Sequence, residues 1–156
     1  MKSLIIGSSN NLKKISELLI EKIDDLFFLN SEQFKFSSWA ALNRDNVTFY
    51  NGEAKEIDTL LKAGLEDSDI IIIDMGDDAE SLFVAQKCNI NLSNTIFIIL
   101  DDMSISDIFE DLGFIILDSS NLALDKVVKY IEKFECKRIL LLMESIVSHK
   151  FCMKNC

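Results

Sequence analysis

Short apolar runs alternate with amphipathic segments along most of the chain. The run at residues 70–73 consists of four isoleucines. A run without polar residues is typical of a central strand in a parallel sheet that is covered on both faces. The runs that predict strands cover residues 4–6, 26–29, 47–50, 70–73, 95–100 and 114–117.

Between these runs, apolar residues recur at spacings of three and four, which is the pattern of one helix face. The helices predicted in this way cover residues 12–23, 57–61, 79–88, 105–112 and 122–134. Gly64 follows the second of them, as a glycine beyond a helix C-terminus does. Residues 31–46 are less regular, and Phe34, Trp39 and Leu42 could line a weak helix there.

Strands and helices in this alternation predict βαβ units with right-handed crossovers. Two sets of three strands give an α/β fold of the Rossmann-like type. This is a doubly wound parallel six-stranded sheet, in the order 3-2-1-4-5-6, with helices on both faces. We assign residues 1–134 to this domain and residues 135–156 to a C-terminal tail or extension. Periodicity leaves residues 138–143 open between an extra strand and a continuation of the preceding helix.

The chain is acidic, and its charge restricts the partners that it can have. A net charge of −10 over 156 residues leaves no basic stripe for phosphates, so we expect no nucleic-acid partner. The same charge disfavours an anionic membrane surface. No apolar run approaches the ~20 residues of a spanning helix, and no signal peptide is recognisable. We therefore expect a cytoplasmic protein without direct membrane insertion.

The single histidine and two of the four cysteines lie near the end of the sequence, as His149, Cys152 and Cys156. They could supply three metal ligands, but zinc sites pair a tighter Cys-x2-4-Cys motif with a second pair of ligands. We expect free thiols in a frayed tail and no metal site. With the histidine in the tail, no histidine-based acid–base scheme or triad fits the main domain, and we expect no enzyme.

The first predicted strand runs directly into the turn Gly7-Ser8-Ser9-Asn10-Asn11-Leu12 and then into a helix. In a dinucleotide-binding turn, three glycines permit the tight turn, the approach of the pyrophosphate and close packing of helix on strand. Only Gly7 is present, because Ser9 and Leu12 occupy the other two positions. The helix N-terminus, which Asn10 or Asn11 can cap, keeps its unpaired N–H groups and partial positive charge. We expect weak phosphate binding here, or none.

Two further groups belong to the predicted ligand cleft. Asn30 stands where dinucleotide sites carry an acidic residue that binds the ribose, and it is either a hydrogen-bonding residue or only a turn residue. Four carboxylates follow the fourth strand, on Asp74, Asp77, Asp78 and Glu80. These could bind a hard cation, or they could cap the next helix and favour its positive end. They would also repel a pyrophosphate nearby.

An ordered set of motifs makes residues 1–134 resemble the TrkA-N domains, also called regulator-of-potassium-conductance (RCK) domains. Residues 47–54 (VTFYNGEA) resemble the family's strand and Gly-Asp-Ala-Thr turn, and residues 60–69 (LLKAGLEDSD) resemble its leucine-rich helix. Residues 76–81 (GDDAES) resemble its acidic turn, and residues 109–114 (FEDLGF) resemble the joint before its sixth strand.

The resemblance implies a cytosolic gating module of potassium channels and transporters that binds NAD(H) or an adenine nucleotide. The residues that we predict for cofactor binding are Gly7, Ser8, Ser9, Asn10, Asn11, Asn30, Gly52, Glu53, Gly76 and Asp77. Departures from the family gather at the same site. The family's basic residue near the end of strand five is also absent from residues 98–101. We therefore expect an intact fold with weak or absent ligand binding.

Two functions from different classes follow. The first is a non-enzymatic regulatory subunit or domain that senses a nucleotide and acts on a membrane cation transporter or channel subunit. The second is an assembly scaffold with a vestigial cleft, or the remnant of a protein that joined a TrkA-N domain to a phosphoesterase. An open cleft between Gly7, Asn30 and Gly76 favours the first, and a cleft filled by side chains favours the second.

Oligomerisation is the remaining expectation. Relatives dimerise through the helices that flank the last strands, so the resemblance implies a homodimer or higher oligomer formed through residues 122–134 and the apolar tail. Val127, Val128 and Ile131 lie on one face of the predicted helix. Packing of that face onto the chain's own sheet is the alternative.

Overall fold

The structure is a computed structural model that describes residues 1–31, 36–90 and 94–154. The chain divides into two compact units, Met1–Leu122 and Ala123–Cys156. The predicted division after residue 134 stays a prediction.

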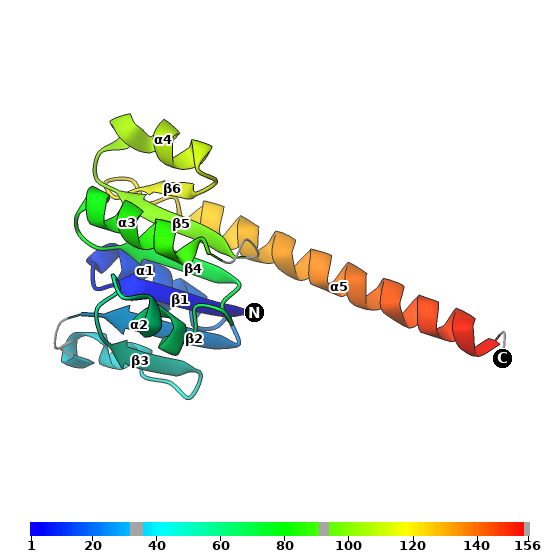
Figure 1. The fold of residues 1–156 in the computed structure, drawn as a ribbon. Coiled ribbons are helices and arrows are strands. Elements are labelled where there is room, and N and C mark those ends of the chain that lie inside the picture. The colour runs from blue at the N-terminus through cyan, green and yellow to red at the C-terminus, as the bar shows by residue number, and fades with distance from the viewer. Residues whose placement is uncertain (32–35, 91–93, 155–156) are drawn as a thin grey trace. The chain divides into compact units, whose positions relative to one another are not determined.

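The first unit contains one sheet of six parallel strands in the order β3-β2-β1-β4-β5-β6, as predicted (Figure 1). The strands are β1 (Lys2–Gly7), β2 (Asp25–Asn30), β3 (Val47–Asn51), β4 (Ile70–Asp74), β5 (Thr95–Leu100) and β6 (Ile115–Asp118). This order is that of the doubly wound α/β fold, with β1 and β4 at its centre.

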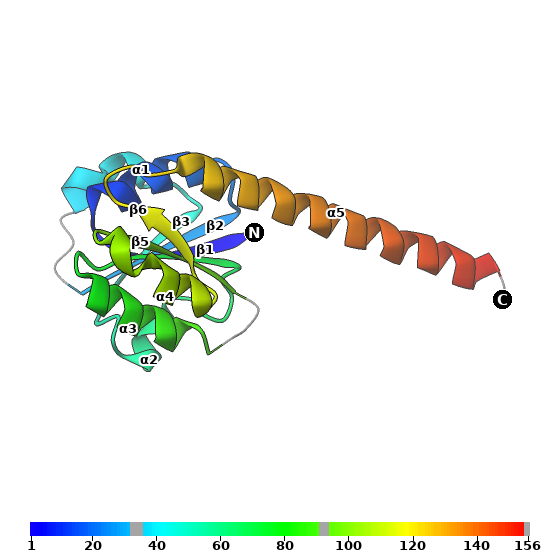
Figure 2. The ribbon, with the colours of Figure 1, turned by 90° about the horizontal axis from the view of Figure 1, so that it is seen from above.

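Helices cover both faces of this sheet, which completes the predicted architecture. Figure 2 shows α1 on one face and α2, α3 and α4 on the other. The helices of the first unit are α1 (Asn10–Leu19), α2 (Ile57–Lys62), α3 (Asp78–Cys88) and α4 (Ser106–Asp111), with short 3-10 helices over Phe36–Leu42 and Met103–Ile105.

The core lies on the two central strands because both of their faces are covered. All four isoleucines of β4 are fully buried, and so are Leu4, Ile5 and Ile6 of β1. Ile5 lies opposite Ile72 in the ladder. Burial of a side chain of this size is worth about 1.5–3 kcal/mol, so these two strands hold much of the stability of the unit.

The irregular stretch after β2 forms a 3-10 helix, Phe36–Leu42, that is kinked at Trp39. Trp39 is buried and packs edge-on against Phe28 of β2, with ring centroids 5.4 Å apart. Leu42 is buried as well. Phe34, the third residue predicted to line a helix here, lies outside the described residues.

The second unit consists of one long helix, α5 (Leu124–Lys154). Residues 138–143, for which the sequence allowed either a strand or a helix, are therefore helical. The described side chains of this helix end at residue 145. His149 and Cys152 lie in the helix without described side chains, and Cys156 lies outside the described residues.

We predict that replacing Ser3 stabilises the protein. Its hydroxyl is fully buried in β1 and has no hydrogen-bond partner among the described residues. An unsatisfied buried hydroxyl is unfavourable, so Ser3→Ala should raise the free energy of unfolding by about 1 kcal/mol in urea denaturation. Ser16→Ala is the control, because the buried Ser16 hydroxyl donates to the Leu12 carbonyl at 2.6 Å. An equal gain in both variants would contradict the explanation.

We also predict that Gly7 cannot be replaced. Its φ is +116°, and a Cβ at this position would lie 1.9 Å from the backbone oxygen of Asp74. Gly7→Ala should therefore abolish folding or lower the free energy of unfolding by more than about 3 kcal/mol, measured by urea denaturation.

Gly76→Ala is the matched control, because Gly76 also has a positive φ, +76°, but an added Cβ there meets no atom within 4 Å. Only the backbone strain of about 1–2 kcal/mol should remain in that variant. The explanation is wrong if the two alanine variants are equally stable.

Candidate functional site

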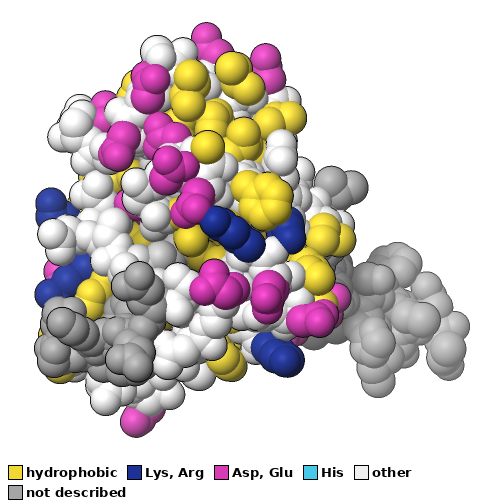
Figure 3. All heavy atoms as spheres, turned by 60° about the vertical axis from the view of Figure 1, so that its left-hand side comes forward, with side chains coloured by type: hydrophobic (Ala, Val, Ile, Leu, Met, Phe, Trp, Pro, Cys, Tyr) yellow, Lys and Arg dark blue, Asp and Glu magenta, His cyan; other side chains and the backbone are white. Residues whose placement is uncertain are grey.

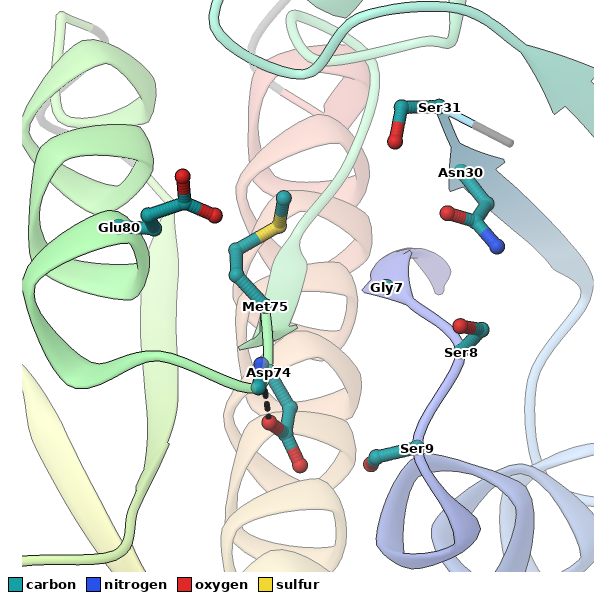
Figure 4. Close-up of a pocket in the computed structure, with 9 residues that line it drawn as sticks. Gly7, Ser8, Ser9, Asn30, Ser31, Asp74, Met75 and Glu80 are labelled. Carbon is teal, nitrogen blue, oxygen red and sulfur yellow. Dashed lines mark hydrogen bonds between the residues drawn. The ribbon is translucent and has the colours of Figure 1, made fainter.

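A cleft of about 370 Å³ opens at the carboxyl ends of the central strands (Figure 4). It lies where α1 and α3 leave two adjacent strands toward opposite faces of the sheet, which is where doubly wound folds bind their ligands. Its nine lining residues are Gly7, Ser8, Ser9, Asn30, Ser31, Asp74, Met75, Gly76 and Glu80. The two glycine turns, around Gly7 and Gly76, therefore face one cleft.

The first wall is the turn between β1 and α1. Ser9 is the N-cap of α1, and its hydroxyl accepts a hydrogen bond from the Leu12 N–H at 3.1 Å. Leu12 is fully buried and does not line the cleft. The leucine at the third glycine position has thus turned into the core, so it does not fill the ligand space.

The second wall is the end of β2. Asn30 is the last residue of this strand, and its side chain faces the cleft together with that of Ser31 (Figure 4). The Asn30 carbonyl accepts a hydrogen bond from the Gly52 N–H at 3.0 Å. The backbone of Asn30 is therefore hydrogen-bonded to the turn after β3, and its amide side chain is available to a ligand.

The third wall is the end of β4. Asp74 lies directly opposite Gly7 in the ladder, and its carboxylate accepts a hydrogen bond from the Gly76 N–H at 3.1 Å. The Met75 N–H donates to the hydroxyl of the buried Ser81 at 3.1 Å, which fixes the turn on α3. The Met75 side chain extends from this turn toward the open space of the cleft (Figure 4).

The other carboxylates after β4 have separate structural partners. Asp77 is the N-cap of α3 and accepts from the Glu80 N–H at 2.8 Å. Asp78 accepts from the N–H groups of Asp101 and Asp102, at 3.0 and 2.9 Å, and so holds the turn after β5. Asp77 therefore caps α3, as predicted, whereas the Asp78 side chain connects the start of α3 to the turn after β5.

Glu80 reaches the cleft from α3 and carries its own counter-ion. The Lys55 ammonium donates a hydrogen bond to the Glu80 carboxylate. This hydrogen bond and the charge of Glu80 raise the pKa of Lys55, so the Lys55 ammonium stays charged at neutral pH. The pair also connects the segment between β3 and α2 to α3.

The cleft is electrically negative. Asp74 and Glu80 line it, and none of its nine described lining residues is lysine, arginine or histidine. Figure 3, in which the left-hand side of Figure 1 comes forward, shows acidic side chains spread over the upper part of the surface with few basic ones among them. A phosphate would therefore meet an unfavourable potential in this cleft.

The structure brings half of the predicted site residues together. Gly7, Ser8, Ser9, Asn30 and Gly76 line the cleft. The other five, which do not line it, are Asn10, Asn11, Gly52, Glu53 and Asp77.

Several of these five have other contacts. The Asn11 side chain donates to the Ser119 carbonyl at 3.1 Å, and the Asp77 carboxylate caps α3. Gly52 packs so closely that an added Cβ would lie 2.5 Å from the Thr59 methyl group.

Sequence reasoning did not assign Ser31 or Met75 to the site. Each directly follows a residue at a strand end, Asn30 or Asp74, where the chain turns over the sheet edge. Asp74 and Glu80 were considered only as parts of a carboxylate group. Proximity to the strand ends was the available signal, but neither serine nor methionine marks a ligand site by its residue type.

A metal centre and a reactive thiol have no support among the described residues. Groups of three or more histidine, cysteine, aspartate or glutamate residues suited to a metal ion do not occur there. Burial raises the pKa of the Cys88 thiol to about 12, so this cysteine stays protonated and is not a nucleophile. Within the same residues, no helix is both long enough and apolar enough to span a bilayer.

Several solved structures have a similar fold. The structure described as Shewanella denitrificans Kef CTD in AMP bound form is 14% identical, with a TM-score of 0.65 over 92% of this chain and 97% of that chain. The GsuK RCK domain is 16% identical, with a TM-score of 0.64 over 86% of this chain and 28% of that chain. The GsuK channel bound to NAD is 10% identical, with a TM-score of 0.57 over 74% of this chain and 21% of that chain.

At these identities the likeness to solved structures establishes the fold alone, and the chain spans less than a third of either GsuK chain. No curated protein matches the sequence. The model of the TrkA-N domain matches residues 4–119, which is more than half of the chain and includes all six strands except the first residues of β1. The chain therefore belongs to the TrkA-N domain family.

Proposed function

We propose that this chain is a non-enzymatic, cytoplasmic regulatory domain that senses a nucleotide and acts on a potassium or other cation transport system. The observation that supports this most is an open, polar cleft at the switch point of the sheet, between the Gly7 and Gly76 turns. Membership of the TrkA-N family and the likeness to AMP-bound and NAD-bound proteins support an adenine nucleotide or NAD(H) as the ligand.

Binding is weak in this proposal, for three physical reasons. Ser9 places a hydroxyl where a glycine would let a pyrophosphate approach the backbone. Asn30 lacks the charge and the two-oxygen acceptor geometry of a ribose-binding carboxylate. The lining residues also include two carboxylates and no cationic side chain.

Regulation rather than catalysis fits the groups present in the cleft. Its described lining residues contain no histidine, lysine or cysteine, and the carboxylates of Asp74 and Glu80 already accept hydrogen bonds from the Gly76 N–H and the Lys55 ammonium. The mechanism that we propose is a population shift. A ligand that binds one arrangement of paired domains more tightly than another favours that arrangement, and a membrane partner responds to the change.

The first prediction for this function concerns binding. Titration calorimetry with AMP, ATP, NAD and NADH should detect binding with dissociation constants of about 0.1–1 mM. Ser8 is exposed and lines the cleft, so the indole of Ser8→Trp should occupy the ligand space and abolish the heat. Ser104→Trp, at an exposed position outside the cleft, is the matched control and should bind as the wild type does. The absence of binding heat with all four ligands would rule out the sensing function, and the assembly scaffold would be the remaining function.

The proposed homodimer or higher oligomer depends on an apolar segment of α5. Residues 139–143 (ILLLM) are five consecutive apolar residues, each 56–61% exposed. Five consecutive positions surround a helix completely, and a helix that is apolar all round is normally buried. Exposed apolar surface of this extent marks an interaction site, and we propose that a second copy of the chain covers it.

The corresponding prediction concerns oligomeric state. Light scattering should give at least the mass of a dimer for the wild type. The double variant Ile139→Glu and Leu142→Glu places two charges three residues apart on one helix face, and it should shift the protein toward the monomer. Ile90→Glu changes another exposed apolar residue, 68% exposed and outside α5, and should leave the mass unchanged. A wild type that is strictly monomeric would rule out this interface.

A further inference from the structure

We infer that Asp74 makes the cleft select uncharged nucleosides over their phosphates. This inference rests on the proposed nucleotide-sensing function and names the chemical class of ligand that the site prefers. It concerns one carboxylate that lies between the two glycine turns. It differs from a general effect of acidic charge because Asp77 and Asp78 do not line the cleft and Glu80 has an ion pair with Lys55.

The position of Asp74 follows from the strand register. Asp74 ends β4 directly opposite Gly7, and its backbone oxygen would lie 1.9 Å from a Cβ added to Gly7. Its side chain lines the cleft and is turned toward the Ser9 turn (Figure 4). The carboxylate accepts the Gly76 N–H at 3.1 Å. Asp74 therefore places an anion between the glycine turns, where a ligand phosphate would lie.

A phosphate at this point needs hydrogen-bond donors and positive charge, and both are reduced. The Gly76 N–H already donates to Asp74, and the Leu12 N–H of the first helical turn already donates to the Ser9 hydroxyl. The Asp74 carboxylate is turned toward Ser9, the N-cap of α1, and so already meets the partial positive charge of that helix end (Figure 4). Two anions at close range inside a cleft repel each other more strongly than they do in bulk water.

No cation of the cleft compensates Asp74 within the described residues. The other lining carboxylate, Glu80, has the Lys55 ammonium as its partner. The Asp74 carboxylate has no ion pair with any described residue, and the hydrogen bond that it accepts comes from a neutral backbone N–H. Repulsion of a phosphate is therefore assigned to Asp74 and not to Glu80.

The rest of the cleft suits a nucleoside. Asn30 and Ser31 offer an amide and a hydroxyl that can bind ribose hydroxyls without adding charge. Met75 gives an adaptable apolar surface on which a base can pack, and its side chain points into the space between Glu80 and Ser31 (Figure 4). These groups recognise the sugar and the base independently of the phosphate.

The experiment compares adenosine and AMP, which differ by the phosphate alone, on the wild type and on Asp74→Asn. Asparagine keeps an oxygen that can accept the Gly76 N–H, so the turn should be retained, and thermal unfolding checks this. In the wild type, we expect adenosine to bind at least fivefold more tightly than AMP. In Asp74→Asn, we expect about tenfold tighter AMP binding, about 1.4 kcal/mol, and adenosine binding unchanged within twofold.

A charge control and a salt series make the result specific. Asp107→Asn removes an exposed carboxylate of α4 that does not line the cleft, and it should leave both affinities unchanged. Added salt should narrow the difference between adenosine and AMP in the wild type, because ions screen a repulsion. Salt weakens most protein–phosphate contacts, because those contacts are attractive. A rise in AMP affinity relative to adenosine on adding salt is therefore a separate test of repulsion.

The outcomes distinguish the two proposals. If the wild type prefers AMP, or if Asp74→Asn leaves the ratio of the two affinities unchanged, the inference about Asp74 is wrong while the sensing function stands. If neither ligand binds either protein at millimolar concentration, the sensing function fails and the inference fails with it. Tighter AMP binding in Asp74→Asn, without a change in adenosine binding, supports both the inference about Asp74 and the sensing function.

Discussion

The arrangement of the site depends on one close contact, between the end of β1 and the end of β4. Gly7 lies so near the backbone oxygen of Asp74 that any side chain at that position would overlap with it. The positive φ of Gly7 then turns the chain away from the sheet into α1. Both consequences require glycine, so the backbone needs this residue whether or not a phosphate binds.

Much of the fold was predictable, because the two central strands are covered on both faces. Residues 70–73 have no polar alternation, which only a fully buried strand permits, and β4 is buried as expected. The helix over residues 138–143 was not predictable from periodicity, because five consecutive apolar residues fit a buried strand and a helix equally well. Helix continuity, which is decided by the flanking residues, is not visible in so short a window.

The candidate site was predictable in place but not in composition. A doubly wound sheet puts the ends of β1 and β4 at one edge, and this alone brings the Gly7 and Gly76 turns together. Which neighbouring side chains face the cleft depends on individual rotamers and hydrogen bonds. Asn11, for instance, lies in the predicted turn but donates to the Ser119 carbonyl. Such a contact joins residues far apart in sequence, and no local pattern reports it.

The four carboxylates after β4 show how a fold and its ligand chemistry can change independently. Asp77 caps α3, Asp78 holds the turn after β5, and Glu80 pairs with Lys55, so these three charges stabilise the local structure. Asp74 adds only one short-range hydrogen bond to its own turn. A change at Asp74 therefore alters the potential of the cleft with little effect on the scaffold, whereas a change at the others disturbs the scaffold first. Ligand preference in this domain can thus shift through one residue while the sheet, its register and the two glycine turns stay fixed.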